Sequence, residues 1–213
     1  MRVLDLETID YDRALGLQRE CQSARIAGEA PDTLFLLEHP HVFTLGRGGL
    51  REDLPQPGEE SGHSAPVFRI GRGGRVTYHG PGQTVGYAIL GLKDLGIGVH
   101  EYLRLLESVL IETLREFSLE GRRIPDLTGV WIGDRKIASI GIGVRRWVSL
   151  HGFALNRVTD LEYFRKIRPC GLDGDRMTSM ERELGQAPLK SEVHTAIVRQ
   201  FGRVFGYDEV EES

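Results

Sequence analysis

The stretch RGGRVTYHGPGQ, residues 72–83, carries the densest structural signal in this 213-residue sequence. Gly73 and Gly74 allow the backbone to approach a ligand with no Cβ in the way, and their N–H groups become available as donors. Thr77 to His79 are typical of a short strand, after which Gly80-Pro81-Gly82 turns the chain sharply. The block has neither the Gly-Lys-Ser/Thr of a P-loop nor the G-x-G-x-x-G that opens a dinucleotide-binding helix. The block therefore argues against a nucleotide site, and by itself it favours a plain glycine-rich hairpin over a ligand site.

Apolar patterns on both sides of this block predict an α+β fold. One-sided apolar stripes, typical of helices on a sheet, follow Asp10, run from His100 to about Ser118, and follow Ser191. Adjacent strands precede the middle helix and meandering strands follow it, unlike the regular βαβ alternation of a parallel sheet. Gly133-Asp134 and Arg145-Arg146 stand at hairpin spacing. The predicted strands are Thr33–Glu38, Val42–Leu45, Val67–Ile70, Val76–His79, Thr84–Leu90, Val130–Ile132, Lys136–Val144 and Trp147–Leu155.

The length and composition predict a single domain, residues 1–213. The net charge of −4 argues against general nucleic-acid binding, which needs a basic surplus. No apolar run approaches the roughly 18 residues of a membrane span, and the start has no signal peptide, so we expect a soluble, cytoplasmic protein. Residues 51–66, polar and with three prolines, are predicted to form a mobile loop, and residues 207–213 a frayed tail.

A lysine stands at the start of an otherwise apolar strand in the segment GDRKIASIG, residues 133–141. Ile137, Ile140 and Ile142 favour burial, so Lys136 is expected beside a wall of low polarity. In such a place the pKa of a lysine can be lowered, and the side chain can shuttle a proton. The alternative is a surface lysine after a Gly-Asp turn.

Two cysteines stand in different contexts. Cys170 lies in a Pro-Cys-Gly sequence, where Pro169 stiffens the approach and Gly171 removes bulk beside the thiol. This setting suits a nucleophile, whereas Cys21 lies on an apolar helix stripe and is expected to be a buried hydrophobic residue. The histidines at 39, 41, 79 and 151, with Cys170, match no common zinc spacing, so no metal site is expected.

Several motifs together resemble the lipoyl(octanoyl) transferase family. Residues 72–83 followed by Tyr87 match its R-G-G-x-x-T-Y-H-x-P-G-Q signature, and HPHVFTLGR, residues 39–47, looks like a strand of the family. The K-I-A-S-I-G context of Lys136, the P-C-G context of Cys170 and HGFALN, residues 151–156, follow in the family's order. Gly143 departs from the pattern, because many relatives carry a larger, often basic residue there. The resemblance spans about residues 33–180.

The resemblance implies a lipoate/biotin protein ligase-like fold, with a larger mixed sheet, a smaller sheet and helices packed outside. It implies transfer of an octanoyl group from octanoyl-acyl carrier protein to the target lysine of lipoyl domains, those of 2-oxoacid dehydrogenase complexes and of the glycine cleavage H protein. No cofactor, nucleic acid or membrane is expected to take part. The alternatives are an ATP-dependent lipoate or biotin protein ligase, which would not need Cys170, and a non-catalytic acyl-binding module.

The same resemblance assigns roles to individual residues. It implies that Cys170 is the nucleophile and Lys136 its proton shuttle. Backbone N–H groups beside Cys170 or between Arg72 and Gly74 are candidates for an oxyanion hole. The substrate-binding residues that it implies are Arg72, Gly73, Gly74, Arg75, Val76, Thr77, Tyr78, His79, Ser139, Ile140, Gly141, Gly152, Phe153 and Ala154.

Overall fold

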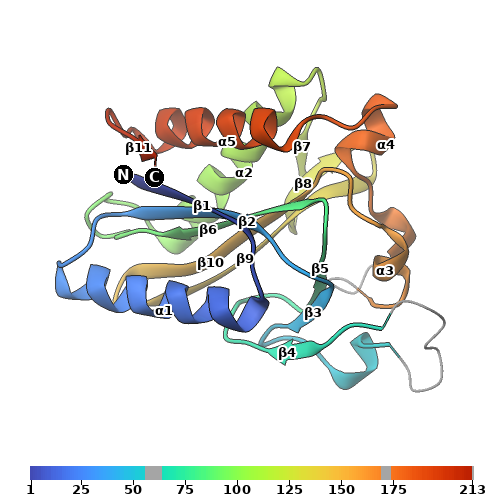
Figure 1. Cartoon of the computed structure of the whole chain (residues 1–213), viewed down its shortest axis with the longest axis horizontal. Helices are drawn as coiled ribbons and strands as arrows, with labels where there is room; N and C mark the ends of the chain where they lie inside the picture. Colours follow the sequence, from blue (N-terminus) through green and yellow to red (C-terminus); the bar gives the residue numbers. More distant parts are fainter. Residues whose placement is uncertain (56–63, 169–173, 213) are drawn as a thin grey trace.

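An eight-stranded mixed sheet forms the centre of the protein (Figure 1). The structure is a computed structural model and describes residues 1–55, 64–168 and 174–212. Across this sheet the strands follow the order β11-β1-β2-β6-β10-β9-β8-β7. Their bounds are Arg2–Thr8 (β1), Thr33–Glu38 (β2), Gln83–Ile89 (β6), Arg122–Ile124 (β7), Leu127–Ile132 (β8), Arg135–Arg145 (β9), Val148–Asn156 (β10) and Glu211–Glu212 (β11).

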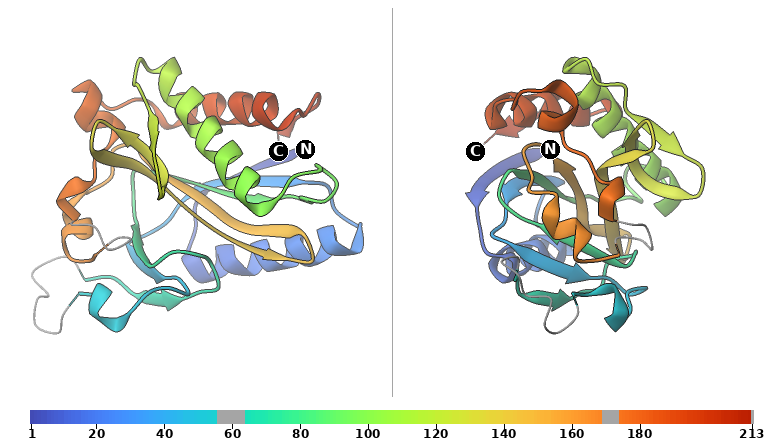
Figure 2. Two further views of the ribbon diagram at one scale, coloured as in Figure 1. Left: turned by 180° about the vertical axis from the view of Figure 1, so that it is seen from behind. Right: turned by 90° about the vertical axis from the view of Figure 1, so that its right-hand side faces the viewer.

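Helices cover both faces of the large sheet (Figures 1 and 2). On one face, α2 (Val99–Glu116) and α5 (Lys190–Phe205) pack over a core that includes Leu34, Leu110 and Phe201. On the other face, α1 (Tyr11–Ala27) covers a smaller core that includes Phe35 and Tyr87. The short helices α3 (Glu162–Arg165) and α4 (Met180–Leu184) lie at one end of the sheet.

A second, three-stranded sheet lies beside the N-terminal end of α1 (Figure 2). Its strand order is β4-β3-β5, and β5 contains part of the glycine-rich block. Tyr11 and Leu15 of α1 pack with Val42 of this sheet, with Phe68 and Ile70 against them. The bounds of the strands are Val42–Leu45 (β3), Val67–Arg69 (β4) and Val76–His79 (β5). The fold predicted from the sequence, a larger mixed sheet and a smaller one with helices outside, is therefore present.

Charge and length explain the strands that the sequence patterns missed. Strand β7 is three residues long with two arginines, and β1 has only one fully buried residue, Val3. Both lie at or near the edges of the sheet. Strands there are buried on one side only, so apolar and polar residues alternate only weakly along them. The second predicted hairpin turn is shifted by one residue: Arg146 and Trp147 have φ values of 48° and 64°. Two consecutive positive φ values are typical of a type I′ turn.

Two segments predicted to be loose are ordered where the structure describes them. Within residues 51–66, Arg51–Asp53 form a 3₁₀ turn in which Asp53 is buried and ion-paired with Arg75 at 2.5 Å. Residues 56–63 lie outside the described residues. In the tail predicted to fray, β11 pairs in parallel with β1, and the Tyr207 hydroxyl donates to Asp32 at 2.7 Å. The tail is therefore ordered because it extends the sheet.

The Tyr207 contact can be tested by removing its hydroxyl. Tyr207→Phe is expected to lower the free energy of unfolding by about 1–2 kcal/mol, because Asp32 loses one donor to a charged acceptor. Urea unfolding followed by circular dichroism measures the change. Asp208→Asn, at the exposed neighbouring position, is the matched control and is expected to leave stability unchanged. An equal free energy of unfolding for Tyr207→Phe and the parent would mean that this hydrogen bond of the tail contributes nothing to stability.

Candidate active site

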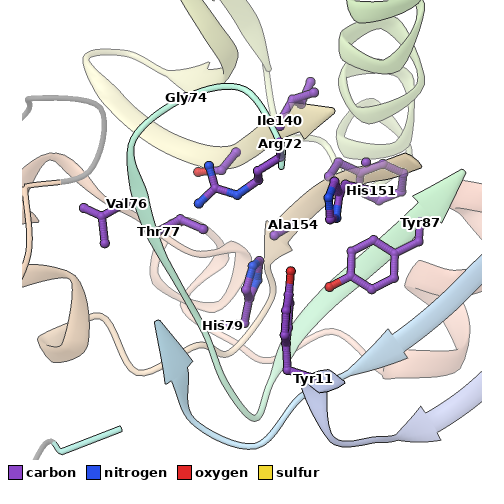
Figure 3. Close-up of a pocket in the computed structure, with 14 residues that line it drawn as sticks. Tyr11, Arg72, Gly74, Val76, Thr77, His79, Tyr87, Ile140, His151 and Ala154 are labelled. Carbon is purple, nitrogen blue, oxygen red and sulfur yellow. The ribbon is translucent and has the colours of Figure 1, made fainter. Parts of the chain in front are cut away.

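A pocket lies between the two sheets and the start of α1 (Figure 3). It encloses about 520 Å³ of space, open solvent included. All but three of the predicted substrate-binding residues line it, so segments far apart in the sequence meet here. The lining residues are Tyr11, Arg72, Gly74, Val76, Thr77, His79, Tyr87, Ser139, Ile140, Gly141, His151, Gly152, Phe153 and Ala154.

The three remaining predicted residues lie elsewhere for identifiable reasons. Gly73 lines a neighbouring pocket, and its N–H donates to Ile142 O at 2.8 Å, so this donor is already occupied. The Arg75 guanidinium turns to the buried carboxylate of Asp53. Tyr78 points to the other side of the small sheet, where its ring stacks on Tyr163 of α3 at 4.5 Å. Of these, only Gly73 stays close to the pocket.

Three aromatic residues in the lining were not among the predicted binding residues. Tyr11 begins α1, and nothing in its local sequence marks it as a pocket residue. Tyr87 follows the glycine-rich block and His151 opens the HGFALN motif, so both were within recognised patterns. His151 has a φ of 63° although it lies in a strand, and its N–H donates to Gln18 Oε1 at 3.1 Å. This strained backbone directs its ring into the pocket wall.

Strand register brings the small residues of the pocket side by side. Gly152 of β10 lies between Gly141 of β9 and Tyr87 of β6. A Cβ at Gly141 would come within 2.9 Å of Arg72 Cδ, so the glycine leaves room for the arginine stem. The Arg72 guanidinium donates to Thr44 O and Oγ1 at 2.8 Å each. These bonds join the Arg72 loop to β3, and the Gly73 N–H bond to Ile142 O joins the same loop to β9 of the large sheet.

The buried histidines of the pocket are neutral. Burial lowers the pKa of His79 to about 3, and the nearby His39 and Arg72 add to the effect. Burial also lowers the pKa values of His39 and of His151 to about 4. His39 Nδ1 lies 2.6 Å from Ile9 O, which can only accept, so Nε2 accepts from the Tyr87 hydroxyl at 2.8 Å. The pocket therefore carries its positive charge on Arg72 rather than on imidazolium groups.

Lys136 lies in a second pocket that adjoins the first. The two pockets share Gly74, Ile140 and Gly141 as lining residues. Lys136 is 3% exposed, and its Nζ lies 5.4 Å from the centre of the Trp131 ring, at cation–π distance. A Cβ at Gly129 would lie 2.6 Å from Lys136 Cε, so this glycine makes space for the side chain. The predicted burial of Lys136 beside an apolar wall is confirmed.

Cys170 lies outside the described residues, but the residues that flank its segment are placed. Before it, Arg168 N donates to Asp53 O at 3.2 Å. After it, Met177 pairs with Lys136 in a parallel bridge, and Thr178 N donates to Lys136 O at 3.0 Å. The Arg176 guanidinium lies 5.5 Å from the same Trp131 ring that Lys136 contacts. The chain that follows the Cys170 segment is thus held against the strand that carries Lys136.

Comparison with known proteins assigns the chain to a family. Residues 10–202 match the model described as the lipoyl protein ligase A/B catalytic domain. An octanoyltransferase of Syntrophobacter fumaroxidans is 47% identical over 209 residues, which cover 97% of this chain and 91% of the relative. One from Solibacter usitatus is 49% identical over 205 residues, covering 95% of this chain and 92% of the relative. The chain belongs to the octanoyltransferase family.

The fold of this family member is that of the lipoate ligases. A crystal structure of lipoate-protein ligase A bound with ATP superposes with a TM-score of 0.83 at 18% sequence identity, covering 100% of this chain and 87% of that one. At this identity the likeness shows the fold alone. The fold expected from the sequence motifs is therefore confirmed.

The described residues contain neither a cluster of metal-ligating side chains nor a membrane-spanning helix. Within residues 1–55, 64–168 and 174–212, no group of three or more His, Cys, Asp or Glu side chains is placed to hold a metal ion. None of the helices in this part of the chain is long and apolar enough to cross a membrane. Histidines 39, 79 and 151 instead pack in and around the wall of the pocket.

The buried histidines predict a loss of stability in mild acid. Each contributes stability that is complete above its unfolded pKa of about 6.5 and is lost as the pH falls toward about 4, because only the unfolded chain takes up the proton. The loss is up to about 1.4 kcal/mol per pH unit for each histidine. Urea unfolding between about pH 7 and pH 5 measures the slope. His79→Gln should flatten it, whereas a variant of the exposed His100, His100→Gln, should not; equal slopes would contradict the assignment.

Proposed function

We propose that this chain transfers an octanoyl group from octanoyl-acyl carrier protein to the target lysine of a lipoyl domain, through a thioester on Cys170. The observation that carries the proposal is a pocket with a largely apolar lining that opens beside a buried lysine, in a chain of the octanoyltransferase family. An acyl chain fits the first pocket because carbon and glycine surfaces line much of it. The reacting end then lies at the side shared with the Lys136 pocket.

The proposed first half-reaction forms an acyl-enzyme. The Cys170 thiolate attacks the thioester carbonyl of the carrier, and the carrier sulfur leaves as a thiol after Lys136 gives it a proton. A nearby ammonium stabilises the thiolate, so Cys170 and Lys136 titrate as a coupled pair. Because the Gly73 N–H is bound to Ile142, the Gly74 N–H and the N–H groups beside Cys170 are the proposed oxyanion donors.

The second half-reaction forms the amide. The neutral amine of Lys136 takes a proton from the incoming lysine ammonium of the lipoyl domain, and the resulting amine attacks the octanoyl thioester. The amide bond replaces the thioester bond, the Cys170 sulfur leaves as a thiolate, and the attacking nitrogen releases its second proton to solvent. Because this exchange is downhill, no ATP is required and no cofactor is proposed.

The proposed partners follow from the two half-reactions. The acyl donor is octanoyl-acyl carrier protein, and the acceptors are the lipoyl domains of 2-oxoacid dehydrogenase complexes and the glycine cleavage H protein. We place the reaction in the cytoplasm, without nucleic acid or membrane. Donor and acceptor use the same site in turn, because the acyl-enzyme separates the two steps.

The nucleophile and the source of the acyl group are tested together. Purified protein, octanoyl-carrier and a lipoyl domain should give octanoyl-domain without nucleotide, measured as the mass of the domain. Cys170→Ala should abolish transfer and leave no acyl adduct. Cys21→Ala is the matched control and should keep most activity, since Cys21 lies on the buried face of α1 and burial raises its thiol pKa. Product formed only from free octanoate or lipoate with ATP, unaffected by Cys170→Ala, would instead establish the ligase alternative.

Lys136→Met tests the proton shuttle while keeping the stem that packs over Gly129 and Trp131. Amide formation is expected to fall by about 10²–10⁴-fold, the usual contribution of a general acid–base group. Rapid quenching and mass spectrometry measure acyl-enzyme and product separately. Lys93→Met, at an exposed lysine, is the control. Amide formation at near-normal rates in Lys136→Met would remove Lys136 from the mechanism.

A further inference from the structure

The first pocket has an open side and a closed side. Gly74 is exposed, and Ile140 and Gly141 are partly exposed, at the side shared with the Lys136 pocket. Tyr11 and Tyr87 are each 4% exposed. Figure 3 shows Tyr11 across the pocket from Gly74 and Ile140, with its hydroxyl directed into the space between them. An acyl chain that enters beside Lys136 therefore runs toward Tyr11.

The width of the sheet sets the depth of the pocket. The lining crosses from β9 through β10 to β6, with Gly141, Gly152 and Tyr87 in register. Two inter-strand steps of about 4.8 Å make roughly 10 Å. Seven carbon–carbon bonds of about 1.5 Å, in an extended zigzag, span roughly 9 Å. The distance from β9 to β6, the strand that carries Tyr87, is thus close to the length of an eight-carbon chain.

The closed side is rigid. The Tyr87 hydroxyl is fixed by its hydrogen bond to His39. The Tyr11 ring packs against His39 and Phe68, with ring centres 5.2 Å apart in both cases, and it stacks on His79 at 6.2 Å. These contacts come from α1, β4 and β5, so the ring cannot swing aside without moving the small sheet against the helix.

The chemistry of the Tyr11 hydroxyl adds to its steric effect. Burial raises the pKa of Tyr11 well above its usual range, so the hydroxyl stays protonated. No hydrogen bond of this hydroxyl is found among the described residues. A longer acyl chain would press methylene groups against it and cut it off from water, which is unfavourable for a polar group.

We propose that Tyr11 ends the acyl pocket and thereby limits the transferred chain to about eight carbons, the chain length estimated above from the strand spacing. The inference rests on the proposed function, because it assigns the first pocket to the acyl group. It identifies Tyr11 as a residue that determines chain-length specificity. Tyr11 lies on α1, which carries none of the family motifs quoted above. Tyr11 contacts the end of the acyl chain, far from the reacting atoms.

The test measures kcat/KM for hexanoyl-, octanoyl- and decanoyl-carrier with the parent chain and with Tyr11→Ala. Each additional buried CH₂ is worth about fourfold in affinity, so two give about sixteenfold. Tyr11→Ala should raise the decanoyl-to-octanoyl ratio by at least about tenfold. Tyr11→Phe removes only the hydroxyl and should give a smaller shift in the same direction. Asp12→Ala, at the exposed neighbouring position, should leave the ratio unchanged.

A reciprocal variant covers the case in which Tyr11→Ala does not fold. Ala154 of β10 lies between the open side and Tyr87 and is 3% exposed. Ala154→Leu fills part of the pocket and should shift the preference from octanoyl toward hexanoyl. Tyr11→Ala lengthens the pocket and Ala154→Leu shortens it, so the two variants should shift the chain-length preference in opposite directions. A general loss of stability would not produce opposite shifts.

The outcomes separate this inference from the proposed function. If the parent chain transfers no acyl group of any length, the proposed function fails and the length limit fails with it. If the parent transfers octanoyl but Tyr11→Ala keeps the same length profile, the function stands and Tyr11 is not the limit. Transfer of longer acyl chains by His151→Gly but not by Tyr11→Ala would also overturn the proposal. His151 separates this pocket from the groove beside Arg19, so the chain would then end at His151.

Discussion

Arg72 and its neighbour Gly73 link the two sheets between which the pocket lies. The Arg72 guanidinium donates to Thr44 of the small sheet and to Gly73 O, and its stem passes over Gly141 of the large sheet. A buried guanidinium is costly unless its donors are satisfied. The loop that carries Arg72 is joined to the large sheet by the Gly73 N–H, which donates to Ile142 O of β9 at 2.8 Å. The side of the pocket that adjoins Lys136 lies at this junction, because Gly74 and Gly141 line both pockets.

The same buried charge controls the electrostatics of the pocket. Beside Arg72, protonation of His79 or His151 would place two positive charges in a buried space, which adds to the effect of burial on their pKa values. With the imidazoles neutral, His39 can accept from Tyr87 and keep that ring in place. A single cation at the pocket wall thus helps to keep its closed side apolar and rigid, which suits a hydrocarbon chain.

Trp131 organises the side of the pocket where we propose that the reaction takes place. Its ring contacts Lys136 and Arg176, one on the central strand β9 and the other on the chain that follows the Cys170 segment. The bridge between Met177 and Lys136 fixes the same two segments through the backbone. Lysine and cysteine stand 34 positions apart in the sequence, and these contacts are the physical link between their neighbourhoods. These contacts of the flanking residues are consistent with the proposal that Lys136 and Cys170 act together.

The sequence by itself determined the features that depend on local patterns. Strand alternation, the Gly-Asp turn and the motifs around Lys136 and in residues 72–83 were sufficient for the fold class, the family and most of the pocket lining. Local signals failed at short or charged edge strands and at the tail, where pairing with a distant strand supplies the order. They also did not show that the side chains of Arg75 and Tyr78 turn away from the pocket, because a motif does not show which direction each side chain takes.

Only the tertiary structure decided where the pocket ends. Tyr11 and Tyr87 are 76 positions apart, and no periodicity relates them. They meet because α1 packs across the face of the sheet at β6, and because the small sheet presses Phe68 against the start of that helix. The depth of the pocket then follows from the spacing of β9, β10 and β6. That distance is set by backbone hydrogen bonds between strands, whose pairing the linear order of residues does not contain.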